Sequence, residues 1–242
     1  MIDFLTKFIK YVYSTKQQPF RLKDRTDFVK HRDPMDEYRL LAPVYDPLLH
    51  MVMHRVRRKV VQIVQQLKPE QIIDICCGTG NQLKYLKRHG FHNIIGVDLS
   101  RSMLDQAGRG SSRVPCDQMD ASAMNFEDNR FDLGIISFAL HEKPFAVARQ
   151  IVDEAARVIH NQGHLIVVDY MFDGHARLSA RTAIHVVERM AGRSHYRYFR
   201  QYLKNGGPNH LLSDYPVKEE YRFHGQATGI RVHSMEKYGQ YA

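Results

Sequence analysis

A short apolar segment that breaks into a glycine turn constrains the fold more than any other part of the chain. Residues 71–81 read Gln-Ile-Ile-Asp-Ile-Cys-Cys-Gly-Thr-Gly-Asn. The apolar run at 72–75 is typical of a strand buried on both faces, and Gly78 and Gly80 allow a sharp turn in which a ligand approaches bare backbone. The N–H groups that open the next helix would then face a small polar ligand. The segment predicts a strand, a turn and a helix with a ligand site between them.

The spacing of the glycines excludes two common nucleotide-binding turns. A dinucleotide site requires G-x-G-x-x-G, but the count from Gly78 reaches Leu83 at the third position, and no Gly-Lys-Ser/Thr tail of a phosphate loop follows. What remains is an acidic residue ahead of Gly-x-Gly, followed later by Asp98 at the end of a second apolar segment. A carboxylate there can accept two hydrogen bonds from ribose hydroxyls. The pattern therefore predicts a nucleoside pocket.

Further motifs follow in order along the chain. Met119-Asp120-Ala121 comes after a predicted third strand, residues 131–140 form a fourth strand and a loop, and residues 163–170 form a fifth strand. This order resembles the class I S-adenosylmethionine-dependent methyltransferases. It is most similar to the ubiquinone and menaquinone biosynthesis methyltransferases, whose fourth-strand motif runs Ile-Ser-Phe-Gly-Leu-Arg-Asn. Residues 136–142 here read Ile-Ser-Phe-Ala-Leu-His-Glu.

The resemblance implies S-adenosylmethionine as the cofactor and a small-molecule methyl acceptor, quinone-like or aromatic. The family's cofactor contacts carry over onto Thr79, Asp98, Asp120, Ala121 and Ser137. The complete expected cofactor site consists of Asp74, Cys76, Gly78, Thr79, Gly80, Asp98, Leu99, Met103, Asp120, Ala121, Ser137 and Phe138. Two positions depart from the family. Cys76 stands where the turn often has its first glycine, and His141-Glu142 replaces Arg-Asn in the acceptor region, so a quinone substrate does not follow from the likeness.

Strands and helices alternate over residues 70–170, which favours a parallel α/β sheet with right-handed crossovers. Two more strands, at 217–223 and 228–233, are separated by a short turn and predict a final antiparallel hairpin. The expected fold class is therefore α/β: a Rossmann-like, seven-stranded methyltransferase sheet, mostly parallel, with helices on both faces and a helical cap. The hairpin distinguishes it from a dehydrogenase domain.

Two helical segments are expected to roof the site and exclude water. Residues 1–69 would form an N-terminal helical cap, and residues 70–242 the cofactor-binding domain with a helical insertion at about 176–210. Insertions after the fifth strand lie above the carboxyl ends of the strands, where ligands bind. Four prolines divide the first segment, and each is expected to end or interrupt a helix: Pro34, Pro43, Pro47 and Pro69.

Two side chains are candidates for the chemistry. His141 follows the fourth strand, and an imidazole titrates near neutrality. It would accept a proton from a phenol, amine or activated carbon, with Glu142 orienting the ring or binding the acceptor. The alternative is a structural role as a cap of the next segment. Tyr45 lies in Ala-Pro-Val-Tyr-Asp-Pro, which resembles the cofactor-covering N-terminal segment of the family.

The basic composition invites a nucleic-acid interpretation, which we do not favour. The formal net charge is +9, and residues 193–200 mix arginines with aromatics as an RNA-stacking surface does. The other basic cluster, 54–59, lies on a predicted helix with an apolar opposite face. A basic helix face that is exposed to solvent therefore explains this cluster. No recognised binding module accompanies either cluster. An RNA methyltransferase and a non-catalytic cofactor-binding scaffold remain the alternatives.

Other features set the expected surroundings. Three cysteines make no disulfide framework, so we expect a cytoplasmic protein. We also expect a monomer or a homodimer. An apolar stripe within residues 2–12, beside two lysines, would allow peripheral membrane contact. His50 and His54 stand four apart but have no third ligand placed by spacing, so no metal site is expected.

Overall fold

A single seven-stranded sheet organises the computed structural model, which describes residues 42–109 and 112–236, with side chains from Met53 onward. The strands are β1 (Ile72–Ile75), β2 (Ile94–Asp98), β3 (Cys116–Gln118), β4 (Phe131–Ser137), β5 (Ile159–Tyr170), β6 (Val217–Phe223) and β7 (Thr228–Ser234). Their order across the sheet is β3-β2-β1-β4-β5-β7-β6. Strands β1 to β5 are parallel, and β7 runs antiparallel to both β5 and β6. The predicted fold class, including the final hairpin, is confirmed.

The direction of strand order reverses between β1 and β4. The chain proceeds outward from β1 to β3 and then returns to place β4 on the other side of β1. The register pairs Ile75 with Ile136, so these two strands end side by side. Connections leave such a pair in opposite directions, which opens a crevice at the carboxyl ends of the strands. The topology thus positions the turn after β1 next to Ser137.

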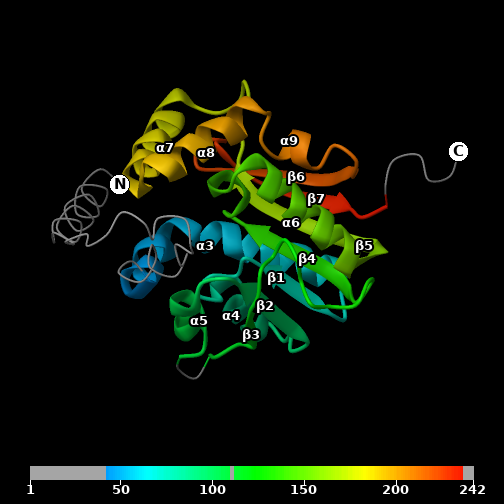
Figure 1. The fold of residues 1–242 in the computed structure, drawn as a ribbon. Helices are drawn as coiled ribbons and strands as arrows, with labels where there is room; N and C mark the ends of the chain where they lie inside the picture. The colour runs from blue at the N-terminus through cyan, green and yellow to red at the C-terminus, as the bar shows by residue number, and fades with distance from the viewer. Residues whose placement is uncertain (1–41, 110–111, 237–242) are drawn as a thin grey trace, which may run out of the picture.

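Helices cover both faces of the sheet (Figure 1). One face carries α3 (Ala42–Leu67), α4 (Asn81–Arg88) and α5 (Arg101–Ala107), and the other carries α6 (Phe145–Val158) and the short α9 (Pro208–Leu211). A single 3-10 turn, η1 (Leu140–Glu142), follows β4. Helices α7 (Leu178–Ala191) and α8 (Arg193–Lys204) form the expected insertion, and α8 contacts η1. The insertion therefore lies at the sheet edge where β4 ends.

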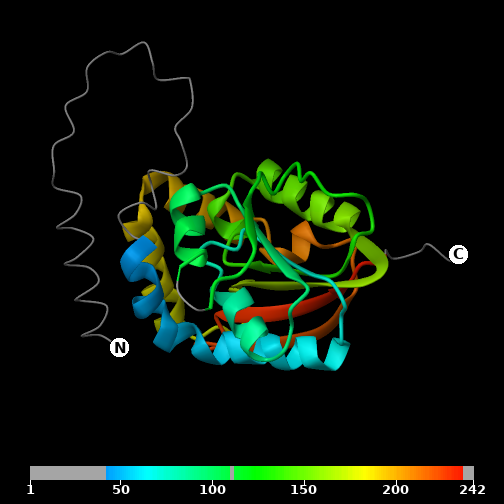
Figure 2. The same ribbon diagram turned by 90° about the horizontal axis from the view of Figure 1, so that it is seen from below.

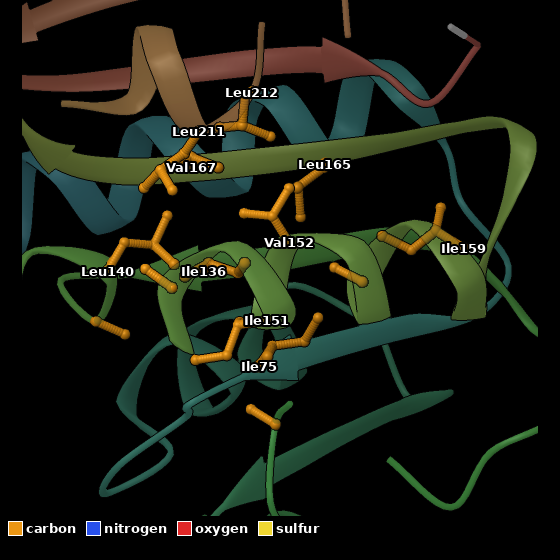
Figure 3. Packing of buried hydrophobic residues seen from close by; sticks show 14 of the residues in the cluster. Ile75, Ile136, Leu140, Ile151, Val152, Ile159, Leu165, Val167, Leu211 and Leu212 are labelled. Atoms are coloured by element: carbon orange, nitrogen blue, oxygen red, sulfur yellow. The ribbon is translucent and has the colours of Figure 1, made fainter. Parts of the chain in front are cut away.

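The core is divided by the sheet into two apolar layers. Ile151 and Val152 of α6 pack against Ile136 and neighbouring strand residues, as Figure 3 shows. On the opposite face, Val60 and Val64 of α3 pack against alternate residues of the same strands. Both faces of the central strands are buried, which explains their continuous apolar sequences.

Helix α3 contains two of the prolines that were expected to interrupt it. Figure 2 shows this helix running along one face of the sheet, opposite α6. Pro43 and Pro47 both lie in its first two turns, so the expectation was wrong for these two residues. The first four N–H groups of a helix have no partner within it, which accounts for Pro43, the second residue of α3. Pro47 is the sixth residue, and α3 continues through it without the hydrogen bond that its N–H would make. Pro69 does follow the helix end, whereas Pro34 lies outside the described residues. The boundary at residue 69 between a cap and a domain stays a prediction.

Gly163 in β5 offers a test of the packing. A Cβ there would lie 2.6 Å from the Asp132 carbonyl oxygen and 2.9 Å from that of His160, and backbone atoms yield little. We expect Gly163→Ala to lower the free energy of unfolding by about 2 kcal/mol. Gly174→Ala, whose Cβ meets nothing within 4 Å, should change it by less than about 0.5 kcal/mol in the same urea titration. Equal stabilities would contradict this account.

Candidate functional site

The turn after β1 has an unusual backbone. Cys76, Gly78 and Gly80 all adopt positive φ, at 61°, 54° and 66°. A left-handed conformation costs a residue with a Cβ about 1–2 kcal/mol, so Cys76 is strained where glycine would not be. This strain gives the physical reason why the related turns favour glycine at that position. Burial raises the pKa of the Cys76 thiol to about 12, so it is no thiolate nucleophile at neutral pH.

Asp98 fixes the shape of this turn. Its Oδ2 accepts the Gly78 N–H at 2.8 Å, and its Oδ1 accepts the Ser100 N–H at 2.8 Å. The carboxylate therefore joins the end of β2 to the turn after β1 and to the start of α5. Each oxygen retains a second lone pair, which is available to a ligand hydroxyl. The expected ribose contact of Asp98 stays a prediction.

The two glycines of the turn have different surroundings. A Cβ on Gly80 would lie 2.9 Å from Val114 Cγ2 and 3.1 Å from Ala107 Cβ, so Gly80 is required by packing. A Cβ on Gly78 would meet nothing within 4 Å. Gly78 therefore borders open space where a ligand can approach the main chain. The Lys84 ammonium donates to the Thr79 carbonyl at 3.0 Å and stabilises the turn.

The end of β4 supplies a polar atom that lacks a partner. Ser137 Oγ is buried and has no hydrogen-bond partner among the described residues. The next residue, Phe138, has a positive φ of 54°, which is strained for a bulky side chain. Buried polar groups are normally satisfied, and strained backbone clusters at ligand sites. Both features lie beside the turn after β1.

Asp74 in β1 is a buried acid, 2% exposed. Burial, with the nearby Asp98 charge, raises the pKa of its carboxyl to about 8, although Arg57 opposes this shift. Burial also raises the pKa of Asp98, against its two main-chain hydrogen bonds. Two acids that resist ionisation in one pocket would both be stabilised as anions by a cationic ligand.

The other expected cofactor residues surround the same edge. Asp120 and Ala121 follow β3, and Asp120 Oδ1 accepts the Ser122 N–H at 2.8 Å. Met103 is buried in α5, whereas Leu99 is 43% exposed after β2. The structure thus brings the ends of β1, β2, β3 and β4 together. Tyr45 lies in α3, but its side chain is outside the described part of the chain.

His141 in η1 is buried, 3% exposed, and belongs to a network of carboxylates. Its Nδ1 lies 2.7 Å from Asp169 Oδ1 at the end of β5, and its Nε2 lies 3.7 Å from Glu188 Oε2 of α7. Burial alone would lower the pKa of the imidazole, but the charge and hydrogen bond of Asp169, with Glu188 and Glu142, raise it to about 9. The ring is therefore protonated at neutral pH when only these groups surround it. The network does not favour a neutral imidazole that could act as a general base.

Three partners of His141 were not identified from sequence. Asp169, rather than Glu142, orients the ring, since the Glu142 carboxylate pairs with Lys143 at 2.8 Å. Glu188 and His195 come from the insertion, and their side chains are joined at 2.6 Å. No clear signal in the sequence marked Glu188, because Arg181 and His185 lie on the same side of α7. Their meeting depends on how α7 and α8 fold back onto η1.

Aromatic rings enclose the same histidine. The ring centroids of Tyr170, His195, Phe199 and Tyr202 lie 4.7, 5.7, 6.1 and 6.3 Å from that of His141. Phe199 and Tyr202 are buried, so part of the aromatic sequence around residue 198 forms core rather than an exposed stacking surface. The basic, aromatic cluster is therefore explained largely by packing within the insertion.

Residues 72–163 match the family model of a methyltransferase domain. This stretch of the chain is similar to the methyltransferase domains that the model describes. The demethylmenaquinone methyltransferase of Thermotoga maritima is 29% identical over 163 residues, which cover 65% of this chain and 63% of that protein. A ubiquinone/menaquinone biosynthesis C-methyltransferase of a Ruegeria species is 27% identical, with coverage of 61% and 62%. The chain thus spans less than two thirds of the length of these relatives.

A solved structure shares the fold of this chain. A putative O-methyltransferase of Nostoc punctiforme superposes with a TM-score of 0.60 at 16% identity, covering 95% of this chain and 69% of that one. At this identity the similarity establishes the fold alone. A separate finding concerns membranes: within residues 42–109 and 112–236, no helix is both long and apolar enough to cross a bilayer.

Asp74 predicts a pH dependence of stability. Its folded-state pKa of about 8 exceeds the ordinary 3.8, so unfolding releases a proton that the folded chain retains. The stability that the folded chain gains by retaining the Asp74 proton is fully present below about pH 4 and is lost as the pH rises toward about 8. Relative to Asp74→Asn, the protein should lose on the order of 4 kcal/mol between about pH 5 and pH 8 in urea titrations. Parallel stability curves for the two proteins would show that Asp74 is ionised in the fold.

Proposed function

We propose that this protein is an S-adenosylmethionine-dependent methyltransferase that acts on a small molecule. The observation that carries the proposal is the turn after β1, whose Gly78 N–H is fixed by Asp98 at 2.8 Å within a domain matched by a methyltransferase model. A dinucleotide would require a third glycine, and Leu83 stands at that position. The relatives named as methyltransferases support the same activity.

The chemistry of the pocket fits this cofactor. S-adenosylmethionine carries an ammonium and a sulfonium, and the pocket contains the buried acids Asp74 and Asp98. The free lone pairs of Asp98 suit ribose hydroxyls, and Ser137 Oγ is a buried hydroxyl without a partner among the described residues. The open space beside Gly78 admits a ligand to the main chain. We infer that these residues, with Thr79, Asp120 and Ala121, hold the cofactor.

The bound cofactor would supply an electrophilic methyl group on its sulfonium. The contribution of the protein is to orient the acceptor and exclude water, because methyl transfer is a direct displacement that depends on alignment. Helices α7 and α8 serve the second purpose, since α8 lies against η1 and carries the buried Phe199 and Tyr202. We infer that His141 lies on the acceptor side of the site and helps to position the acceptor.

The acceptor is proposed to be a small aromatic or quinol-like compound. The rings of Tyr170 and Phe199 beside His141 support an aromatic acceptor, and the curated relatives are named for quinone biosynthesis. His141-Glu142 stands in place of the Arg-Asn of the quinone methyltransferase motif, so we propose an acceptor with a different ring substituent. A cytoplasmic location, peripheral membrane contact and a monomeric or homodimeric state stay predictions.

Cofactor selectivity tests the pocket. We expect S-adenosylhomocysteine to bind at micromolar concentration and NAD to bind far more weakly in titration calorimetry. Asp98→Ala should weaken S-adenosylhomocysteine binding by about 1.5–3 kcal/mol, because hydrogen bonds to a charged group are lost. Asp132→Asn changes an acid remote from the turn and is the matched control. Equal affinity for NAD, or unchanged affinity in a folded Asp98→Ala protein, would contradict the proposal.

A second test concerns the acceptor side. We expect His141→Gln to leave S-adenosylhomocysteine affinity nearly intact and to lower methyl transfer about 10²-fold. Turnover would be measured on a panel of quinol, phenol, amine and thiol compounds. Undiminished turnover would make His141 structural. Cofactor affinity that falls in proportion to activity would instead place it in the nucleoside pocket.

A further inference from the structure

Three metal-ligating side chains converge beside the acceptor side of the site. His141 comes from η1, Glu188 from α7 and His195 from α8. One ligand atom from each lies within 4.8 Å of the other two. Specifically, Glu188 Oε2 lies 3.7 Å from His141 Nε2 and 2.6 Å from His195 Nε2. Two imidazole nitrogens and one carboxylate oxygen thus surround a common point.

We propose that His141, Glu188 and His195 bind one divalent transition-metal ion of the Zn²⁺ class. Two histidines and one carboxylate form a recurrent catalytic set, which leaves a fourth position open. Neighbouring ligands on a tetrahedral zinc ion are about 3.3 Å apart. The 3.7 Å pair is already near that separation, and the 2.6 Å pair, joined by a hydrogen bond, would open by less than about 1 Å.

The groups around these three residues are those that support metal ligands elsewhere. The Nδ1 of His141 is held by Asp169 Oδ1 at 2.7 Å, which directs Nε2 toward Glu188. The Tyr170 hydroxyl donates to Glu188 Oε1 at 2.9 Å and leaves Oε2 for the ion. A histidine ligand almost always gives its other N–H to a carboxylate or carbonyl, and ligating carboxylates are themselves hydrogen-bonded. His141 and Glu188 meet these conditions, and the Nδ1 of His195 lies 3.8 Å from Glu142 Oε2.

The charges of the cluster also favour a bound cation. Asp169, Glu188 and Glu142 are three carboxylates, and one ammonium, that of Lys143, pairs with Glu142. With neutral imidazoles, two negative charges remain uncompensated within the cluster. Buried charges are normally paired or bound to metal. Either two imidazole protons or one divalent cation restores neutrality, so the cation would replace two protons, including the one between His195 and Glu188.

This proposal differs from the expectation that the chain has no metal site. The pair considered from sequence was His50 and His54. His54 Nδ1 instead lies 2.9 Å from the Tyr85 hydroxyl, and the side chain of His50 is not described. The three proposed ligands come from separate elements, so no motif spacing joins them.

The open position gives the ion a role at the acceptor. A hydroxyl or thiol bound to Zn²⁺ loses its proton more readily, and that proton would pass to solvent. This role rests on the proposed methyltransferase function, whereas binding of the ion does not. It would also explain why the network around His141 is organised to hold a ring rather than to accept a proton.

Metal binding can be measured directly on the full chain without a histidine tag. After removal of metal with chelator, titration calorimetry with Zn²⁺ should show one tight site per chain, and Co²⁺ should give the visible absorption of a tetrahedral site. We expect Glu188→Gln and His195→Asn each to weaken Zn²⁺ binding about 100-fold or more, and Asp169→Asn about 10- to 100-fold. His195 is the more exposed ligand, so its variant keeps the test open if Glu188→Gln fails to fold.

Two controls separate this site from others. His160 pairs with Asp132 at 2.8 Å at the far end of β5, so His160→Gln removes a comparable histidine–carboxylate pair and should leave Zn²⁺ binding unchanged. Cys77 and Cys116 have sulfur atoms 3.8 Å apart, and Cys116→Ser should also change nothing. Zn²⁺ binding that survives Glu188→Gln and His195→Asn, or that disappears in Cys116→Ser, would overturn the proposal. S-adenosylhomocysteine affinity, measured in parallel, reports on the proposed function independently.

Discussion

The hydrogen bonds of the Asp98 carboxylate are the interaction on which the turn after β1 depends. The carboxylate accepts main-chain N–H groups from Gly78 and Ser100 and thereby joins the end of β2 to the turn after β1 and to the start of α5. The turn lies beside the end of β4 because strand order reverses between β1 and β4. Asp98 thus fixes Gly78, which borders open space next to the strained Cys76, and Lys84 fixes the following Thr79 carbonyl.

The charge of the site is opposite to the charge of the whole chain. The chain carries a formal net charge of +9, yet buried acids gather at the carboxyl ends of the strands. Asp74 and Asp98 lie on the proposed cofactor side, and Asp169 and Glu188 lie on the side of the insertion. Buried anions are costly without a compensating cation. A cationic cofactor and a divalent ion would each supply that compensation. Both halves of the site therefore have the same requirement, a cation that neutralises buried carboxylates.

Much of the fold could be predicted because its signals are local. The apolar segments at 72–75 and 131–137 are strands at those residues, since a strand buried on both faces needs a continuous apolar run. The final hairpin was predicted from its short turn. Pro43 was misjudged because proline costs little within the first four residues of a helix, and the sequence does not mark the start of α3 clearly. Pro47 was misjudged because α3 continues through it at the sixth residue.

The sequence by itself determined the sheet, the glycine turn, the place of Asp98 and the position of His141 after β4. Only the tertiary structure decided what surrounds His141. Asp169, Glu188 and His195 approach it from β5, α7 and α8, so their meeting depends on the packing of the insertion against η1. Spacing along the chain reports contacts within one helix or one strand. Contacts among separate elements follow from the burial of apolar faces, which places polar side chains together at distances that no motif records.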